Sequence, residues 1–448
     1  MDEEELEEIC TAVLQAIEVH SSSDIRSLLE RLHPADIANL LESITPDQRQ
    51  RLWPELPLEL MGEVLIEVPE GVQKSLMETL SPQLLARAIL SLDIDEIADL
   101  FPDLPDDITA RVLFDLDQET RQDLDAVLAW PEDTAGGLMN VDTVTIRANV
   151  KLAVVQRYLR LLGELPEYTD QLFVVDPHNR LKGALSLPAI LTSDGSDQVA
   201  DIMETEPVSF TTLVEDEKVA TAFERYNLIS AAVVDENNIL LGRITIDDAV
   251  DVIRDEAEHT MMVQAGLDEE DDIFAPVVRT SCKRALWLGV NLVTALLAST
   301  VIRSFEATIE QVVALAALMT IIASMGGNAG TQTLTIVIRG MGTGTITSLN
   351  AWQVMKKEIL VGAFNGLVWA LVVAVVTALW YHDIYLGMVI AAAMAINLLF
   401  AAAAGVVLPL LVKQLGIDPA LASGVALTTV TDIVGFFSVL GLAYVFLI

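Results

Sequence analysis

The sequence predicts a multi-domain membrane protein with an all-α superhelical N-terminal domain, a pair of small α/β units, a linking helix and five transmembrane helices. Three observations predict this order. Hydropathy changes near Cys282, weak helical repeats fill the first 130 residues, and a segment of about sixty residues then occurs twice. We place the boundaries at residues 1–130, 131–246, 247–275 and 276–448, with the α/β units at about 137–195 and 200–246.

Charge separates the two ends of the chain. The net charge is −39 although 52% of the residues are hydrophobic. Only six of the 65 acids and seven of the 26 bases follow Cys282, which leaves 59 acids and 19 bases, a net charge of −40, before it. Such an acidic segment repels nucleic acid and attracts cations. The alternative interpretation is that the charge only keeps the surface of this half soluble. With two cysteines and no apolar leader, we expect this part to remain in the cytoplasm.

The first 130 residues show apolar spacing and capping signals of short helices. Thr45-Pro46-Asp47-Gln48 predicts a capping box with proline at the first helical position. The segment 36–41 (DIANLL) resembles 96–101 (EIADLF), sixty residues later. Repeated helical pairs of this kind predict a small α-solenoid, in which each repeat buries its apolar face on the next.

Two α/β copies follow. Val175 and Val234 end apolar strands, and Gly183 and Gly242 lie in the strands that come next; both pairs are separated by 59 residues. In each copy an Asp-rich turn joins the two strands. This pair resembles tandem CBS domains, which bind adenine nucleotides or ions. The resemblance implies a ribose site at Thr245 and Asp248, whereas the first copy has Ala189 at the position of the acid.

The segment that joins the two halves is strongly acidic. Asp248, Asp251 and Asp255 are spaced i, i+3 and i+7, so we expect them on one face of a helix. Like charges at this spacing destabilise a helix unless bound divalent cations neutralise them. A solvated linker helix is the alternative interpretation of this stretch.

Five apolar spans follow, at about residues 285–302, 309–338, 354–380, 384–412 and 419–446. With the N-terminus in the cytoplasm, six bases fall on the inner side and only Arg303 falls outside, which agrees with the positive-inside rule. The inner bases are Lys283, Arg284, Arg339, Lys356, Lys357 and Lys413. An odd number of spans then places the C-terminus outside.

One acid lies deep in a span. Asp432 is near the middle of the last span, where an ionised carboxylate costs at least about 2.5–3.5 kcal/mol. It is either an ion ligand or a polar residue satisfied by neighbouring threonines. In the second span Gly326 and Gly330 form a small-xxx-small packing pair, and Asn328 adds a polar group that packing does not require. We read Glu358 as an interfacial ion pair and Asp418-Pro419 as a helix N-cap, with a secondary role for Asp418 at the pore mouth.

A deep carboxylate among hydroxyls and amides suits a hard cation such as Mg²⁺, which keeps several waters while one or two carboxylates hold it. Two Asp432 residues across a dimer axis would form a wide hydrated site, and five spans are few for a self-contained transporter. We therefore expect a homodimer embedded in the bilayer.

The whole chain resembles the MgtE family of magnesium channels in its domain order and in the motifs at residues 326–332, 418–420 and 429–435. The resemblance implies a homodimeric Mg²⁺ channel of the inner membrane, with Co²⁺ or other divalents as lesser substrates, closed by intracellular Mg²⁺ and with ATP as a further ligand of the CBS pair. The implied pore residues are Asp432, Gly327, Asn328, Thr331, Thr428 and Thr429. The implied regulatory residues are Asp95, Asp99, Asp247, Asp248, Asp251 and Glu256. This chain departs from the family at His259 and Thr260, where related sequences continue with acids.

Two other functions stay open. A secondary transporter that exchanges divalent cations for Na⁺ or H⁺ would use Asp432 as its exchanging carboxylate, although such carriers usually repeat their spans and we find no repeat here. A CBS sensor without conductance would leave Asp432 without a role. We do not expect an enzyme, because the sequence shows no nucleophile with a base and no phosphate-binding loop.

Overall fold

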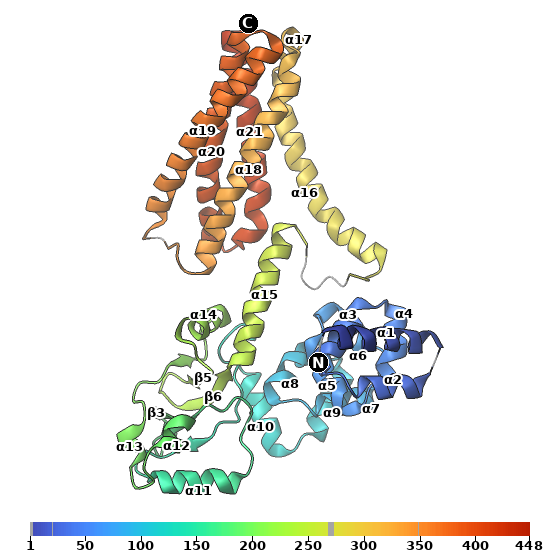
Figure 1. The fold of residues 1–448 in the computed structure, drawn as a ribbon, viewed down its shortest axis with the longest axis vertical. Helices are drawn as coiled ribbons and strands as arrows, with labels where there is room; N and C mark the ends of the chain where they lie inside the picture. The colour runs from blue at the N-terminus through green and yellow to red at the C-terminus, as the bar shows by residue number, and fades with distance from the viewer. Residues whose placement is uncertain (1–2, 20, 268–272, 348) are drawn as a thin grey trace. The chain divides into compact units, whose positions relative to one another are not determined.

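The computed structural model describes residues 3–19, 21–267, 273–347 and 349–448 (Figure 1). These residues separate into two units. The first comprises the chain up to Glu258 together with the short segment that ends at Ala275, and the second comprises His259–Glu269 and Pro276–Ile448.

The first unit begins with an all-α domain, as predicted. Its α-helices are α1 (Glu3–Val19), α2 (Ser22–Leu29), α3 (Pro34–Ser43), α4 (Pro46–Leu52), α5 (Leu58–Glu67), α6 (Glu70–Met77), α7 (Pro82–Ile89), α8 (Ile94–Leu100), α9 (Asp106–Asp115) and α10 (Gln118–Val127), with 3₁₀ turns η1 (Trp53–Glu55) and η2 (Phe101–Asp103). The predicted capping box opens α4, where the Thr45 backbone N–H donates to Gln48 Oε1 at 3.0 Å. Asp93 and Glu96 form a second box at α8.

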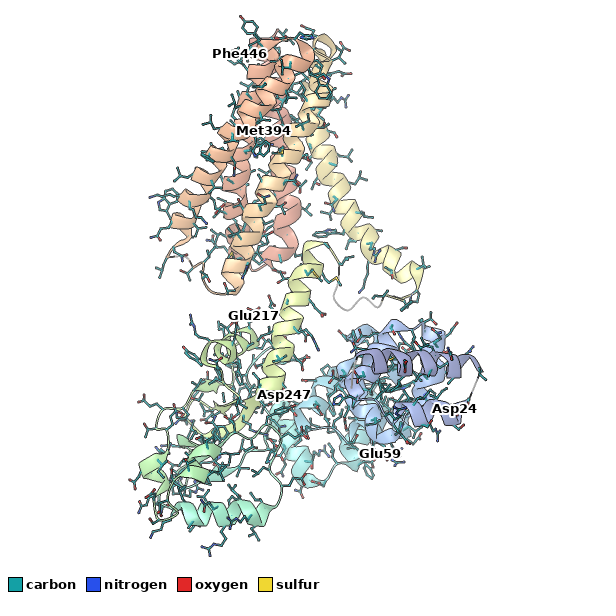
Figure 2. The ribbon with its side chains drawn as sticks, viewed as in Figure 1. Asp24, Glu59, Glu217, Asp247, Met394 and Phe446 are labelled. Carbon is teal, nitrogen blue, oxygen red and sulfur yellow. The ribbon has the colours of Figure 1, made fainter. Side chains whose placement is uncertain are left out.

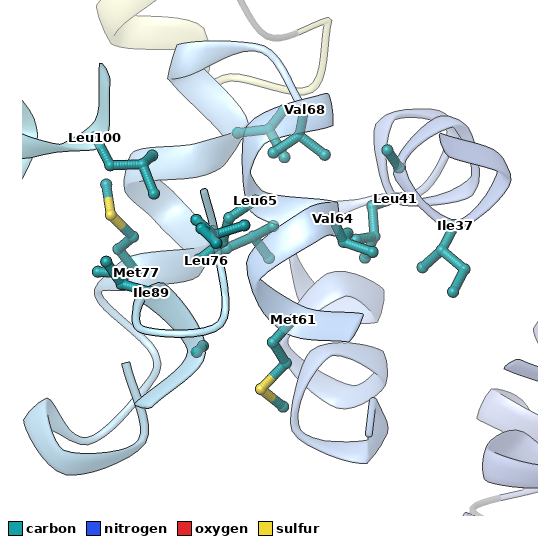
Figure 3. Packing of buried hydrophobic residues seen from close by; sticks show 14 of the residues in the cluster. Ile37, Leu41, Met61, Val64, Leu65, Val68, Leu76, Met77, Ile89 and Leu100 are labelled. Carbon is teal, nitrogen blue, oxygen red and sulfur yellow. The ribbon is translucent and has the colours of Figure 1, made fainter. Parts of the chain in front are cut away.

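Apolar residues at helical spacing hold this domain together. Helices pack on the next but one along the chain, α3 on α5, α5 on α7 and α7 on α9. Figure 3 shows Leu41 of α3, Val64 and Leu65 of α5 and Leu76 of α6 in the core, and all of them are buried. Ile37 of α3 and Ile97 of α8 occupy the same place in the two sequence repeats, and both are buried. The repeat therefore marks equivalent core positions.

Two three-stranded sheets follow, each in one α/β copy. The first copy contains β1 (Thr145–Ile146), α11 (Leu152–Leu162), β2 (Gln171–Val175), β3 (Leu181–Ser186), α12 (Leu187–Thr192) and α13 (Val199–Ile202). The second contains β4 (Ser209–Thr211), α14 (Asp216–Tyr226), β5 (Ser230–Val234) and β6 (Leu240–Thr245). In each sheet the first strand is parallel to the second and the third antiparallel to it. The register repeats with the sequence, since Val174 faces Gly183 and Val233 faces Gly242.

Reciprocal contacts join the two copies. The Leu181 N–H donates to the Asn238 carbonyl and the Leu240 N–H donates to the Asn179 carbonyl, both at 2.9 Å. A shared apolar core with Phe173 and Val234 lies between the sheets. Gly242 is required by a close approach, because a Cβ there would lie 2.6 Å from the Asn140 carbonyl oxygen. The paired CBS arrangement expected from the sequence is confirmed.

After β6 the chain continues directly into α15 (Ile246–Gln264), and Figure 2 shows Asp247 at the first turn of this helix. The second unit then contains α16 (Val277–Ser304), α17 (Glu306–Gln311), α18 (Ala314–Gly342), α19 (Ala351–Tyr381), α20 (Ile384–Gln414) and α21 (Pro419–Phe446). All of these except α15 and α17 are long and apolar enough to cross a membrane, which confirms the five predicted transmembrane helices.

Helix α20 lies at the centre of the membrane bundle. It packs against α18, α19 and α21, and its residue Met394 is buried inside the bundle (Figure 2). The second span differs from the prediction at its start, since residues 306–311 form the separate helix α17 and the long helix begins only at Ala314. Glu306 and Glu310 explain this difference, because they keep the short helix polar.

Candidate functional site

Helices α18 and α21 bring the two polar motifs of the membrane half together. A Cβ at Gly330 of α18 would lie 2.9 Å from Leu427 of α21. A Cβ at Gly435 of α21 would lie 3.6 Å from the Cα of Ala323. The helices therefore run antiparallel in close contact, and the segment around Gly326 lies at the level of Asp432.

The single chain leaves all of the predicted pore residues at least partly accessible. Asn328, Thr331 and Thr428 are exposed in the apolar bundle, while Gly327, Thr429 and Asp432 are half-buried. The Thr428 hydroxyl donates to the Gly424 carbonyl at 3.1 Å, and the Thr429 hydroxyl donates to the Val425 carbonyl at 2.7 Å. Because each donor is used within the helix, the hydroxyl oxygens keep lone pairs for another partner.

Asp432 has no such partner among the described residues. In the described parts of the chain, no side chain or backbone group donates a hydrogen bond to its carboxylate. The threonines next to it donate to backbone carbonyls instead, and Thr431 is buried with its hydroxyl 3.1 Å from the Thr428 carbonyl. None of these threonine hydroxyls therefore donates to the Asp432 carboxylate, and the role of Asp432 stays a prediction.

A second membrane-half carboxylate is more buried than the sequence indicated. Lys357 lies 3.5 Å from Glu358, as expected for an interfacial ion pair, but Glu358 is only 4% exposed. The Thr333 hydroxyl on α18 donates to Glu358 Oε2 at 3.2 Å. Glu358 therefore also joins α19 to α18, a contact that a position next to two lysines did not predict.

Asp418 caps α21 as predicted, since its carboxylate accepts from the Ala420 backbone N–H at 2.8 Å. His259 of α15 reaches the same residue, with Nε2 at 3.3 Å from Asp418 Oδ2. The position at which this chain departs from the family thus contacts the predicted pore mouth, within the second unit.

In the first unit, acids of α8 and α15 face one another. The pKa of Asp248 is raised to about 8 by burial and by the nearby charge of Asp95. Burial and Asp93 raise the pKa of Asp95 to about 6. Asp99 keeps part of its side chain in solvent, yet burial of its carboxyl and the charge of Glu132 raise its pKa to about 7. Three predicted regulatory acids therefore share one electrostatic cluster.

The other predicted regulatory acids lie on α15 and are less buried than this acidic cluster. Burial raises the pKa of Asp251, although Arg254, 3.3 Å away, opposes this shift. Asp247 and Glu256 are exposed on α15. Among the residues with described positions, no three acidic, His or Cys side chains converge closely enough to ligate one ion. The acids are gathered, but they are not arranged as a closed coordination shell.

Sequence reasoning missed several members of this cluster. Burial raises the pKa of Glu96 to about 7, and it also raises the pKa of Asp142 although Arg243 lies 3.2 Å away. Asn140 connects the two domains, because its Nδ2 donates to Asp95 Oδ1 at 3.2 Å. The capping box formed by Asp93 and Glu96 could have indicated the acids of α8 from the sequence, whereas no local sequence pattern marks Asn140 and Asp142.

The implied ribose pair is engaged locally. The Thr245 backbone N–H donates to Asp248 Oδ2 at 3.2 Å, so Asp248 caps the start of α15 and also faces Asp95. In the first copy the Ser186 hydroxyl accepts from the Ala189 N–H at 3.3 Å.

Comparison with known families matches three parts of the chain. The family described as a divalent cation transporter, MgtE, matches residues 319–442. The MgtE intracellular N domain matches residues 32–133, and the CBS domain matches residues 199–255.

Two curated relatives match over nearly their whole length. The magnesium transporter MgtE of Bacillus subtilis is 30% identical over 428 residues, which are 95% of this chain and 94% of that protein. The magnesium transporter MgtE of Thermus thermophilus is 31% identical over 442 residues, 98% of each chain. A crystal structure of the cytosolic domain of the Mg²⁺ channel MgtE in complex with ATP is 31% identical, with a TM-score of 0.50, and covers 54% of this chain and 99% of that one.

Proposed function

Because this chain belongs to the MgtE family of magnesium transporters, we propose that it forms a Mg²⁺-selective channel that passes hydrated divalent cations across the cytoplasmic membrane into the cell. The observation that carries this proposal is the accessible polar surface of the packed helices α18 and α21, with Asn328, Thr331 and Thr428 exposed, and an Asp432 carboxylate to which no described residue donates. Oxygen atoms with free lone pairs are the ligands that Mg²⁺ prefers.

A second copy of the chain would cover this face. Amide, hydroxyl and carboxylate groups are costly in contact with lipid, so they face protein or a water-filled path. In a homodimer the two Asp432 carboxylates would face one hydrated route. Helices α18 and α21 contain no Cys or His, which disfavours soft metals and makes Co²⁺ or other divalents lesser substrates.

The acids of the first unit would close the channel when intracellular Mg²⁺ rises. Asp95, Asp99 and Asp248 repel one another when ionised, and their raised pKa values reflect burial together with that repulsion. A bound divalent cation would replace repulsion with attraction and hold α8 against α15. Asp247, Asp251 and Glu256 would extend this site along α15. The ATP in the related cytosolic domain supports a nucleotide as a further ligand of the CBS pair, with Thr245 and Asp248 as candidate contacts.

The charges of the membrane half support one orientation of the protein. Six of the seven bases in the membrane half fall on one side if the N-terminus is inside, which supports a cytosolic N-terminus and an outer C-terminus. In Figure 1 the C-terminus lies at the same end of the bundle as α17, the helix that follows Arg303 at the end of α16.

Flux measurements in proteoliposomes test the proposal. We expect Asp432→Asn to reduce Mg²⁺ uptake to the level of protein-free liposomes while the protein remains folded and dimeric. Asp383→Asn is the matched control, because Asp383 is an exposed acid that caps α20 and asparagine is an equally good cap. Undiminished uptake by the Asp432 variant would refute the pore assignment.

The same liposomes distinguish a channel from an exchanger. A channel sets a reversal potential that depends on the Mg²⁺ gradient and the voltage alone. A reversal potential that moves with a Na⁺ or H⁺ gradient would instead favour the secondary transporter.

A further inference from the structure

Asn397 occupies the junction of three membrane helices. It lies on α20, is completely buried, and donates from Nδ2 to the Ile322 carbonyl of α18 at 2.8 Å. Two glycines make room for its side chain. A Cβ at Gly326 of α18 would lie 2.1 Å from Nδ2, and a Cβ at Gly435 of α21 would lie 3.1 Å from the same atom.

This junction lies behind the proposed ion path. Gly326 immediately precedes Gly327 and Asn328, and Gly435 is one helical turn beyond Asp432. The side chain of Asn397 therefore stands between α18 and α21 at the level of the proposed pore residues. Because a methyl group at Gly326 would collide with the amide and one at Gly435 would press tightly against it, the amide limits how closely the two helices approach.

Packing alone does not explain an amide at this position. Its Oδ1 is buried with no protein donor among the described residues, which is unfavourable for an amide in an apolar bundle. Leucine would fill a similar volume without an unpaired acceptor. The amide does supply what leucine lacks, a directional bond to the Ile322 carbonyl, the acceptor that the backbone N–H of Gly326 uses in a regular helix.

We propose that Asn397 is a positioning residue that determines selectivity: it holds α18 at a fixed distance from α21 and so sets the width of the path at Asp432. This inference rests on the proposed channel function. The residue does not touch the ion. A wider or more variable path would admit Ca²⁺, which accepts more ligands at longer and less regular distances than Mg²⁺.

A double-mutant cycle in proteoliposomes tests this role, with the ratio of Mg²⁺ to Ca²⁺ flux as the readout. We expect Asn397→Ala and Asn397→Leu to lower this ratio on the order of tenfold, since small displacements of a preorganised site have effects of this size. Gly326→Ala alone should block Mg²⁺ flux because its methyl collides with the amide. In the Asn397→Ala background the same methyl has space, so Gly326→Ala should there be tolerated. Gly289→Ala is the control, because a Cβ at Gly289 meets nothing within 4 Å.

The outcomes separate this inference from the function on which it rests. If the wild-type protein carries no Mg²⁺ current, the proposed function fails. If the wild type conducts but the Asn397 variants keep its flux ratio, or Gly326→Ala is equally harmful in both backgrounds, the positioning role is wrong. A folded Asn397→Leu protein with a lowered flux ratio and a rescued double variant would establish it.

Discussion

Binding of Mg²⁺ to the acids of the first unit should release protons. At pH 7 a carboxyl with a pKa of about 8, such as Asp248, is protonated in about nine-tenths of molecules, and one with a pKa of about 6, such as Asp95, in about one-tenth. Asp99, with a pKa of about 7, is protonated in about half of the molecules, so an ion that binds all three carboxylates must displace about one and a half protons. Linkage then requires the Mg²⁺ affinity to rise about thirtyfold per pH unit near neutrality.

Calorimetric titration of residues 1–264 with Mg²⁺ measures this number directly, because the heat in buffers of different ionisation enthalpy gives the protons released. We expect about one and a half protons per ion near pH 7 and about one-tenth near pH 9, where Asp248 is mostly ionised. Asp248→Asn should reduce the release near pH 7 to about six-tenths of a proton, the combined share of Asp95 and Asp99. Asp176→Asn is the matched control, since this CBS-turn acid has a pKa lowered by backbone N–H groups. Binding without proton release at pH 7 would refute the electrostatic account of the cluster.

Three further predictions concern stability and gating. Because the pKa values of Asp95 and Asp248 are raised in the folded state, the folded protein binds protons more tightly than the unfolded chain. The free energy of unfolding therefore falls as the pH rises from the unfolded pKa values near 4 towards 8. Without divalent cations, the free energy of unfolding of residues 1–264 should therefore fall by about 2 kcal/mol between about pH 5.5 and 7.5, after allowance for the partial exposure of these acids. Urea unfolding at several pH values measures this fall, and a free energy of unfolding that stays constant with pH would contradict it. Gly242→Ala should destabilise the second CBS copy by about 1–3 kcal/mol, because its methyl would lie 2.6 Å from a backbone oxygen; thermal unfolding measures this, with Gly195→Ala as the milder comparison at 3.3 Å from the Ala153 methyl. Deletion of residues 1–258 should leave Mg²⁺ conductance and abolish its inhibition by Mg²⁺ in patch recordings, so a truncated channel that still closes on added Mg²⁺ would place the gate elsewhere.

Local patterns in the sequence predicted much of the fold. The offset of 59 residues between the CBS copies reappears in the strand register, and the proline and capping signals mark the starts of α4 and α21. The five spans were readable because a bilayer demands long apolar helices. These features depend on residues close together in the chain.

Contacts between distant helices were not predictable in this way. Because Glu358 follows two lysines, the sequence predicted an ion pair at the membrane surface. The structure also shows a buried hydrogen bond to Glu358 from Thr333 on α18. In the sequence, Asn397 is only one polar residue within the apolar fourth span. Its role emerges from glycines that lie far away along the chain, on α18 and α21. Neither case has a local pattern, because the physical cause is the packing of separate helices.

The junction between β6 and α15 has a mechanical consequence. The strand ends at Thr245 and the helix begins at Ile246, with Asp248 bonded back to the Thr245 backbone. No loop is left there to absorb torsion, so a rotation of the second sheet must turn the helix with it. The two sheets are themselves joined by reciprocal backbone hydrogen bonds, so the CBS pair and the start of α15 should rotate together as one rigid element.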